Sequence, residues 1–597
     1  MRSVVLALAF LALSSCSSGN GTPGATLDAA PPADAAPDRA GAELSEDHAE
    51  GRMDTEPSCA YLSRHLIPGP CEEGWDAALD AKARRYDRCW TTWNAATFGV
   101  NTDVGVAASR VEDRALIEDW VQNHDGWAGD FEVFAGRPAL DLVTGHNKVA
   151  GLYAGAGIIA DAYRYGVLRD QGYPPADVEQ ARGQLLRALE TLHIATAITG
   201  VEGVICRGLA LKAWGYETVP LFDGNGAPLP PEKNNGVWRE DNSPGHVYPE
   251  LIWEDSVSRD MLIGWAGAFG ASWEVIREDP EIPDGVKATL RADATALGRA
   301  LMVVRESGYD LEVPDADGRT TLHGWLNEHN LDGVIYLPEL ENGFHAVMAL
   351  GIVSSYAYAS GDPVLAAWLQ DDLITARELP RIVREHVAEL ANTGFATNFS
   401  NVNMVFMGFW LALRYVEDPG ARAILRDALK NSMYDRPGEN FQPIEYHYSF
   451  YDFTFAAGWA DASAFGGMAS EPLALSLDNG LDTLRRFREP PFWDLAVINC
   501  PAFEACTCEE DQCWCPPEAT AALCLASDGE TLLTPLGCKG WKCALIVAGP
   551  LPWDLMPPSN YRWRSAPHGA NGGGDGGSLL PGVDFRFAYW MGRWTRR

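Results

Sequence analysis

The sequence predicts a mainly α protein, in which helical hairpins form an inner ring inside an outer ring, followed by a disulfide-rich, partly β C-terminal appendage. Three observations lead to this prediction. Segments that are apolar on nearly all sides alternate along the chain with amphipathic segments. Short turns that contain Pro, Gly or Asp separate the two kinds. After about residue 490 this alternation gives way to closely spaced cysteines.

The alternation predicts which helices are buried. A helix that is apolar all round must be buried on all sides, whereas an amphipathic partner can face water. Apolar helices are expected at 145–169, 256–276, 339–360, 403–415 and, more weakly, 449–465. Amphipathic partners are expected at 175–198, 284–306, 363–390, 419–433 and 471–488, and a first pair at 75–94 and 111–123. These pairs predict a ring with the apolar helices inside; an open solenoid is the alternative.

The first residues have the pattern of a secretion signal. Arg2 gives a positive start, and residues 4–13 form an apolar run too short to span a bilayer. The following Leu13-Ser14-Ser15-Cys16 resembles the bacterial lipobox, in which small residues precede a cysteine that becomes the lipidated N-terminus. The resemblance implies an exported lipoprotein anchored at Cys16. Because Ser17 and not Asp follows, it also implies the outer membrane. An ordinary secretory signal is the alternative.

These patterns divide the chain into four parts. Residues 1–15 are the predicted signal peptide. Residues 16–57 are the lipidated tether, expected to be disordered because they contain almost no large apolar residues; an acidic interaction tail is the alternative. Residues 58–490 are the predicted helical ring, and residues 491–597 are the cysteine-rich appendage that packs on it.

Cysteine usage agrees with export. Removing Cys16 from the 13 cysteines leaves an even number, which indicates disulfides in an oxidising compartment. Eight are expected to pair among themselves: Cys500, Cys506, Cys508, Cys513, Cys515, Cys524, Cys538 and Cys543. Cys59, Cys71, Cys89 and Cys206 are expected to be oxidised as well. A zinc site in the cluster is the alternative, although zinc-binding cysteines are more often separated by two residues.

The net charge of −36 restricts the partners. It argues against nucleic acid and against an electrostatic hold on anionic lipid, so the membrane contact expected is the lipid anchor only. It also disfavours a strongly polyanionic substrate. The glycine-rich residues 572–577 lack the Lys and Ser or Thr of a phosphate-binding loop, and no HExxH spacing occurs. We therefore expect no cofactor and assign no metal site.

Polar residues gather where the chain enters the apolar helices. In a ring these entry segments open onto one end, and capping explains Ser, Asp and Asn there but not His, Lys, Arg and Tyr. The candidate residues are His146, Asn147, Lys148, Glu254, Asp255, Arg259, Asp260, Glu339, His345, Asn403, Glu445, His447 and Tyr448. Trp253 and Trp325 lie in or beside these segments and are expected to stack on sugar rings; core packing is the alternative.

Six such helical pairs resemble the (α/α)6 toroid of six-hairpin glycosidases and related polysaccharide lyases. The resemblance covers roughly residues 70–490 and is architectural. It implies that the partner is a carbohydrate polymer or oligosaccharide. Whether the protein is an enzyme stays open, because one fold hosts many functions.

Two chemistries fit the entry residues. A glycosidase needs two carboxyl groups, for which Asp260 and either Glu254 or Asp255 are candidates, with Glu339 or Glu445 across the ring. Arg259 would keep one of them ionised. The alternative is a lyase, which would use His146, Asn147, Arg259, Asn403, His447 and Tyr448. Hydrolysis is favoured because carboxylates are abundant. A non-catalytic surface lipoprotein that binds glycans or protein is the third possibility. In either enzyme, the expected substrate-binding residues are His146, Asn147, Lys148, Trp253, Trp325, Glu339, His345 and Asn403.

Overall fold

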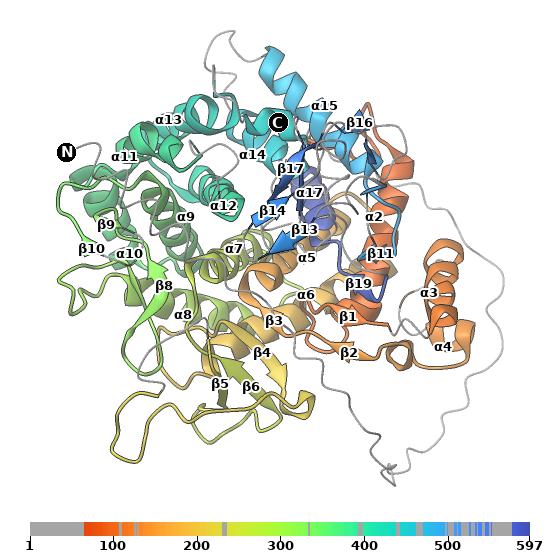
Figure 1. Ribbon diagram of the computed structural model, residues 1–597, viewed down its shortest axis with the longest axis horizontal. Coiled ribbons are helices and arrows are strands. Elements are labelled where there is room, and N and C mark those ends of the chain that lie inside the picture. The colour runs from red at the N-terminus through yellow and green to blue at the C-terminus, as the bar shows by residue number, and fades with distance from the viewer. Residues whose placement is uncertain are drawn as a thin grey trace.

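The computed structural model describes residues 65–106, 110–124, 127, 130–229, 236–331, 333, 335–391, 398–436, 442–460, 470–495, short strands between 498 and 547, residue 551 and residues 576–596. The signal peptide and the tether, with Cys16 and Cys59, lie outside this range. The described chain is mainly helical, which confirms the predicted class (Figure 1). No helix within it is long and apolar enough to cross a membrane.

Six helices form the buried layer. They are α5 (Gly151–Asp170), α7 (Arg259–Ile276), α9 (Gly343–Ser360), α12 (Phe399–Tyr415), α14 (Ser449–Ala460) and α17 (Val583–Trp594). Nearly every described side chain of α5, α9 and α12 is buried, as their all-round apolar sequences predict. Glycines let the backbones approach closely: a Cβ at Gly155 would lie 2.0 Å from the carbonyl oxygen of Gly264, so no larger residue fits between α5 and α7.

The amphipathic helices lie outside this layer. They are α2 (Ala77–Cys89), α6 (Pro175–Ala197), α8 (Asp284–Leu301), α10 (Pro363–Ala367), α11 (Leu379–His386), α13 (Pro419–Ala428) and α15 (Ser470–Arg486). The π-helical segments η1 (Trp90–Asn94), η4 (Trp368–Ala376) and η7 (Leu429–Tyr434) extend α2, α10 and α13, and the 3-10 segment η5 (Val387–Ala391) extends α11. In α8 the buried residues Leu290, Ala294, Leu297 and Leu301 recur every three or four positions. This spacing gives each outer helix one buried face and one face in water.

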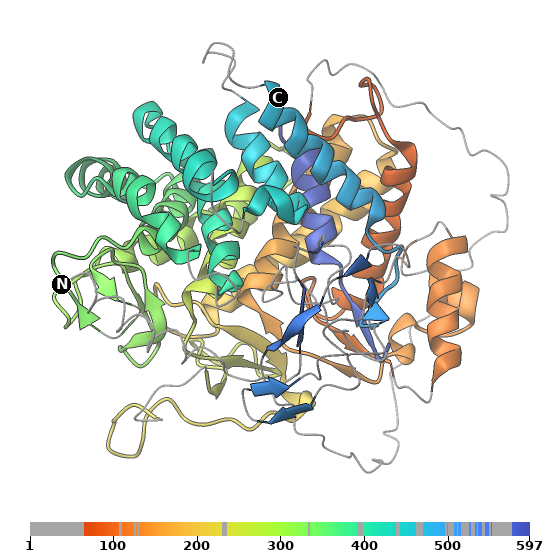
Figure 2. The ribbon, with the colours of Figure 1, turned by 45° about the horizontal axis from the view of Figure 1, so that its top comes forward.

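The contacts between buried helices close on themselves. Along the chain, α5 packs on α7, α7 on α9, α9 on α12, α12 on α14 and α14 on α17, and α17 returns to α5 (Figures 1 and 2). The last helix of the chain therefore lies beside the first helix of the buried layer. The expectation that all of residues 491–597 lie outside the helical body fails for α17.

Two further expectations change with α17. The apolar run 585–590 lies in the appendage that was expected to be partly β, but it is helical; its residues are buried on all sides, a case in which periodicity cannot distinguish helix from strand. The outer partner of α17 is α2. α2 also contacts α3 (Val111–Asn123), the second helix of the expected first pair, but α3 has no place in the buried layer and lies to one side with α4 (Asp130–Ala135) (Figure 1). There Trp93, Trp120 and Phe131 form a small separate core.

All described strands lie in segments that lead from an outer helix to a buried one. Before α5 come β1 (Val104–Gly105), β2 (Gly145–His146) and β3 (Val149–Ala150); before α7 come β4 (Gly208–Leu211), β5 (Trp238–Glu240) and β6 (Leu251–Glu254); before α9 come β7 (Glu312–Pro314), β8 (Thr320–Trp325), β9 (Asn330–Leu331) and β10 (Ile335–Tyr336). Before α17 come β11 (Phe492–Trp493), β12 (Ile498–Asn499), β13 (Thr507–Glu509), β14 (Gln512–Trp514), β15 (Cys524–Ala526), β16 (Leu532–Leu533), β17 (Pro535–Lys539), β18 (Ala544–Val547) and β19 (Ser578–Leu580).

This order makes the two ends of the helical body unequal. The connections from a buried helix to the next outer one are short, such as 361–362 and 416–418. Because each hairpin reverses direction, the long strand-bearing connections collect at the N-terminal ends of the buried helices. Two four-stranded antiparallel sheets form there, in the orders β11-β19-β1-β2 and β3-β4-β6-β5. We call this end the rim.

The cysteines agree with expectation only in part. Cys71 is disulfide-bonded, as predicted. Cys89 and Cys206 are free and buried, so the prediction that they are oxidised is wrong. Each packs in an apolar core, Cys89 beside Trp93, where a thiol behaves as a small hydrophobic group. In the cysteine-rich segment, the register of β13 and β14 sets Cys508 opposite Cys513; the expected disulfides of this segment lie outside the described residues.

Candidate functional site

The densest polar group at the rim lies on the sheet β3-β4-β6-β5. Glu254 is the last residue of β6, and its pairing partners are Gly208 on β4 and Trp238 on β5. Lys148 immediately precedes β3. The sheet therefore brings together residues from three distant parts of the chain. We call Lys148, Arg207, Glu254, Ser258 and Asp260 the rim cluster.

One ion pair and two hydrogen bonds connect the two carboxylates of the rim cluster. Lys148 Nζ donates to Glu254 Oε2 at 2.5 Å, and Arg207 Nε lies 3.8 Å from the same oxygen. Arg207 Nη1 donates to Ser258 Oγ at 2.9 Å, and the Ser258 hydroxyl donates to Asp260 Oδ1. Glu254 is buried and Asp260 is half-buried. The cluster thus holds two acidic groups of different exposure on either side of one arginine.

Two glycines leave space around Glu254. At Gly236, where φ is +123°, a Cβ would lie 2.8 Å from Glu254 Oε1. At Gly208 a Cβ would lie 2.3 Å from the carbonyl oxygen of Val149 and 3.3 Å from Glu254 Oε2. All hydrogen bonds and ion pairs of this carboxylate within the described chain use Oε2. Oε1 therefore keeps its capacity to accept a hydrogen bond.

Two stacked aromatic pairs lie near the rim cluster: one includes His146, two residues before Lys148, and the other includes Trp238, the pairing partner of Glu254. His146 stacks on Trp214 with 5.1 Å between ring centroids and an interplanar angle of 6°. Tyr216 stacks on Trp238 at 4.5 Å, and Lys148 Nζ lies 5.7 Å from the Trp238 ring. All four rings are half-buried. Burial and the nearby Glu254 carboxylate raise the pKa of Tyr216, and burial lowers the pKa of His146.

Trp214 and Tyr216 are site residues that sequence reasoning missed. They follow β4 on either side of Gly215: Trp214 ends the short 3-10 helix η3 (Lys212–Trp214), which is too short to show a period in the sequence, and Tyr216 lies in the loop after it. The only signal in the sequence is a pair of aromatic residues within a polar loop.

Arg259 and His345 connect the beginnings of α7 and α9. Arg259 Nη1 lies 3.3 Å from His345 Nε2, and His345 Nδ1 lies 3.1 Å from the carbonyl oxygen of Asn327. A guanidinium can only donate, so Nε2 accepts and Nδ1 carries the proton that it donates to Asn327. This arrangement fixes His345 as the neutral tautomer with its proton on Nδ1. Arg259 also lies 5.0 Å from the Phe344 ring.

The entry to α14 gathers another part of the predicted set. Asn403 accepts a hydrogen bond from the Tyr451 hydroxyl, and the Tyr448 ring meets the Tyr451 ring edge-on at 4.7 Å. His447 is half-buried, which lowers its pKa. Both His447 and Ser256, just before α7, have a left-handed backbone with φ of 47° and 59°. Such strain at non-glycine residues is concentrated at functional sites.

Two predicted site residues are unavailable to a ligand. Asp255 is fully buried, accepts hydrogen bonds from Arg239 Nε at 2.8 Å and from Nη2 at 2.6 Å, and also accepts from the Val237 amide. Trp253 is fully buried and donates from Nε1 to the carbonyl oxygen of Glu240. Both side chains stabilise the sheet. Neighbouring residues of a strand point to opposite faces, so Trp253 and Asp255 lie on one face and Glu254 lies on the other.

Other predicted residues lie apart from the rim cluster. Glu339, Glu445 and Asn147 are exposed. Trp325 is half-buried, donates to the carbonyl oxygen of Leu322, and meets the Tyr336 ring edge-on at 5.9 Å. The structure thus brings together Lys148, Glu254 and Asp260, but pairs none of them with Glu339 or Glu445 in a described contact.

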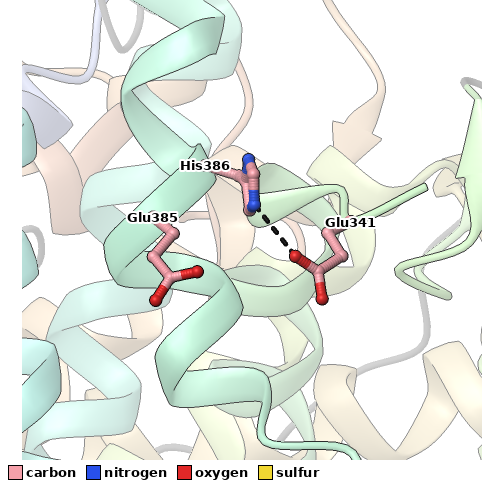
Figure 3. Close-up of side chains that lie close together, drawn as sticks. All are labelled: Glu341, Glu385 and His386. Carbon is pink, nitrogen blue, oxygen red and sulfur yellow. Dashed lines mark hydrogen bonds and ion pairs between the residues drawn. The ribbon is translucent and has the colours of Figure 1, made fainter. Parts of the chain in front are cut away.

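One group has the composition of a metal site. Ligand atoms of Glu341, Glu385 and His386 lie within 4.8 Å of one another (Figure 3). However, Arg381 Nη2 lies 2.6 Å from Glu341, and its Nη1 lies 2.7 Å from Glu385. His386 Nε2 contacts Glu341 at 2.9 Å. Because Arg381 already pairs with both carboxylates and Arg384 also pairs with Glu385, we interpret this group as a surface salt-bridge network between α11 and the segment before α9.

Comparison with known proteins gives no match, whether to a protein family, a curated protein or a solved structure. The chemistry of the rim must therefore be interpreted from its own residues.

Proposed function

We propose that this chain is an exported, lipid-anchored protein whose helical body is an (α/α)6 toroid that hydrolyses glycosidic bonds at the rim cluster. The observation that carries the proposal is the pair of carboxylates, Glu254 and Asp260, connected through Arg207 and Ser258, with the half-buried Tyr216–Trp238 pair beside Glu254.

The cycle of contacts among the six buried helices supports the toroid. Each buried helix also has an outer partner, with α2 serving α17. In a ring of this kind the entries to the inner helices converge at one end. The concentration of strands and polar groups at the rim supports a binding site there, because binding residues commonly lie on loops that a rigid scaffold positions.

The rim cluster has the groups that glycoside hydrolysis requires. One carboxyl must protonate the leaving oxygen, while the other acts as base or nucleophile. Lys148 and Arg207 place positive charge beside Glu254. We assign to Glu254 the role of the carboxylate that stabilises the developing sugar cation. Asp260, half-buried and bonded to a hydroxyl, is the candidate acid. Substrate would reach Glu254 through Oε1.

The aromatic pairs suit a carbohydrate. Sugar rings present C–H faces that pack on indole and phenol rings. Tyr216 and Trp238 are half-buried next to Glu254, so a sugar stacked on them would lie close to the carboxylate. A lipid anchor at Cys16 would hold this site outside the cytoplasm, where a polymer too large to enter the cell can be reached.

An activity screen of residues 58–597 on a polysaccharide panel tests the proposal. Reducing ends and the ultraviolet absorbance of unsaturated uronate are measured together. New reducing ends without that absorbance support hydrolysis. Both signals together would indicate elimination by the His447 and Tyr448 region. Glycan binding without either signal would indicate a non-catalytic binding protein.

A further inference from the structure

A cavity of about 320 Å³ lies at the end of the helical body opposite the rim. Its walls come from the last turns of α7, α9 and α12, from the second half of α14, and from the residues that follow α17, and Arg422 of the outer helix α13 also lines it. Glu274, Tyr358, Arg414, Gly458 and Thr595 represent these five walls. The cavity is therefore lined mainly by helices that also form the buried layer.

Arginine dominates the cavity in a chain of net charge −36. The charged lining residues are Arg277, Arg414, Arg422, Arg596 and a single acid, Glu274. Glu274 is already well supplied with donors: Arg414 Nε lies 2.6 Å from Oε2, and Trp594 Nε1 donates to Oε1 at 2.7 Å. The walls therefore carry positive charge in excess of the one carboxylate.

Helix ends explain only part of this lining. The carbonyl groups at helix C-termini attract cations, which accounts for Arg277 after α7 and Arg414 in the last turn of α12. They do not account for three buried groups that also line the cavity: Trp410 Nε1, Thr454 Oγ1 and Thr595 Oγ1. Within the described chain these groups have no hydrogen-bond partner, although their residues are 2%, 1% and 6% exposed. Buried polar groups without partners are uncommon in folded proteins.

We infer that this cavity binds a small tetrahedral oxyanion, a phosphate or sulfate group. The excess arginine supplies the charge, and guanidinium groups match the oxygens of such anions. The indole N–H and the two hydroxyls supply further donors. The donors come from several walls, so a bound anion must accept hydrogen bonds in more than one plane. A tetrahedral anion can do so, whereas a planar carboxylate cannot. The inference is independent of the rim chemistry.

Calorimetric titration of the full-length protein with inorganic phosphate and with sulfate, at constant ionic strength, tests this site. We expect saturable binding of one anion, with chloride giving no heat of binding. Thr454→Val keeps the shape of the side chain but removes the hydroxyl, and it should weaken binding by about tenfold. Arg277→Gln should do the same. A parallel titration with glycerol phosphate shows whether the group binds free or as an ester.

Two control variants make the result specific. Arg384→Gln removes an arginine of comparable exposure on α11, outside the cavity, and should leave the affinity unchanged. Glu254→Gln at the rim should also leave it unchanged. Absence of saturable binding would overturn the inference, as would equal weakening by Arg384→Gln, since that would indicate surface charge alone. If Thr454→Val does not fold, Arg277→Gln and Arg596→Gln, both at exposed side chains, carry the test.

Discussion

Arg586 Nη2 lies 2.6 Å from Asp161 Oδ1, an ion pair that joins the last helix of the chain to the first buried helix. Arg586 Nε also lies 2.8 Å from Asp87 on α2. All three side chains are fully buried. The helical body is therefore closed by charged groups that lie more than 400 positions apart in the sequence.

Replacing Arg586 should destabilise the whole fold. In Arg586→Met the carboxylates of Asp87 and Asp161 stay buried without this partner, and breaking a buried pair costs about 3–5 kcal/mol. Urea unfolding followed by circular dichroism measures the change. Arg384→Met, at an exposed position, should change the free energy of unfolding by less than about 0.5 kcal/mol. Equal stability of the two variants would mean that α17 does not hold the body closed.

Glu254→Gln should abolish most of any hydrolytic activity that the screen finds. Loss of a catalytic acid or base typically lowers kcat by about 10²–10⁴-fold. Asp260→Asn should act similarly, whereas Glu278→Gln, at a side chain that is almost fully exposed, should leave kcat unaltered. Thermal midpoints measured alongside separate lost chemistry from lost folding. A Glu254→Gln enzyme that retains full activity would remove this residue from the catalytic site.

His146 should contribute to a loss of protein stability as the pH falls. Burial lowers its pKa below the ordinary 6.5, so the folded state favours the neutral ring. This contribution is complete above pH 6.5 and is lost as the pH falls below that value, because the unfolded chain then binds the proton more readily. Unfolding free energies at about pH 7.5 and about pH 5 should therefore differ less in His146→Asn than in the unaltered protein.

His193 provides a control of opposite sign. The Asp293 hydrogen bond raises its pKa, so its contribution is present at low pH and is lost as the pH rises. His193→Asn should therefore lose more stability on acidification than the unaltered protein does. If both histidine variants shift in the same direction, the environments described for these two rings are wrong.

The free thiols of Cys89 and Cys206 should be inert in the folded protein. Burial raises the pKa of Cys89 to about 12, and burial with the nearby Glu254 carboxylate raises that of Cys206. The thiolate is the reactive form, so a disulfide reagent should label neither residue until guanidinium unfolds the chain. Mass mapping without prior reduction then identifies the labelled cysteines. Finding Cys89 or Cys206 in a disulfide would restore the expectation drawn from the sequence.

Cys16→Ala should release the protein from membranes. Attachment is expected through the lipid on Cys16 alone, because the net charge of −36 opposes adhesion to anionic lipid. Fractionation of cells into soluble and membrane parts measures the effect, with Ser17→Ala as the neighbouring control. Unchanged membrane association of the Cys16 variant would rule out the lipobox interpretation.

The sequence by itself determined the helical body. Apolar periodicity located α5, α7, α9 and α12 and their amphipathic partners, because burial on all sides demands an apolar residue at nearly every position. The same pattern also led to the polar entries that contain Lys148, Glu254 and Asp260. These features are local, and local patterns are what a sequence displays directly.

Tertiary structure alone decided how distant segments meet. The pairing of α2 with α17 rests on buried charges contributed by opposite ends of the body, and no local period records it. Adjacent Trp253 and Glu254 took opposite roles, because the sheet buries one face of β6 and turns the other toward Lys148. Asp255 and Glu254 are chemically alike, yet only Asp255 is buried in an ion pair with Arg239. The sequence does not display this difference, because an ion pair depends on distances between side chains and not on their order in the chain.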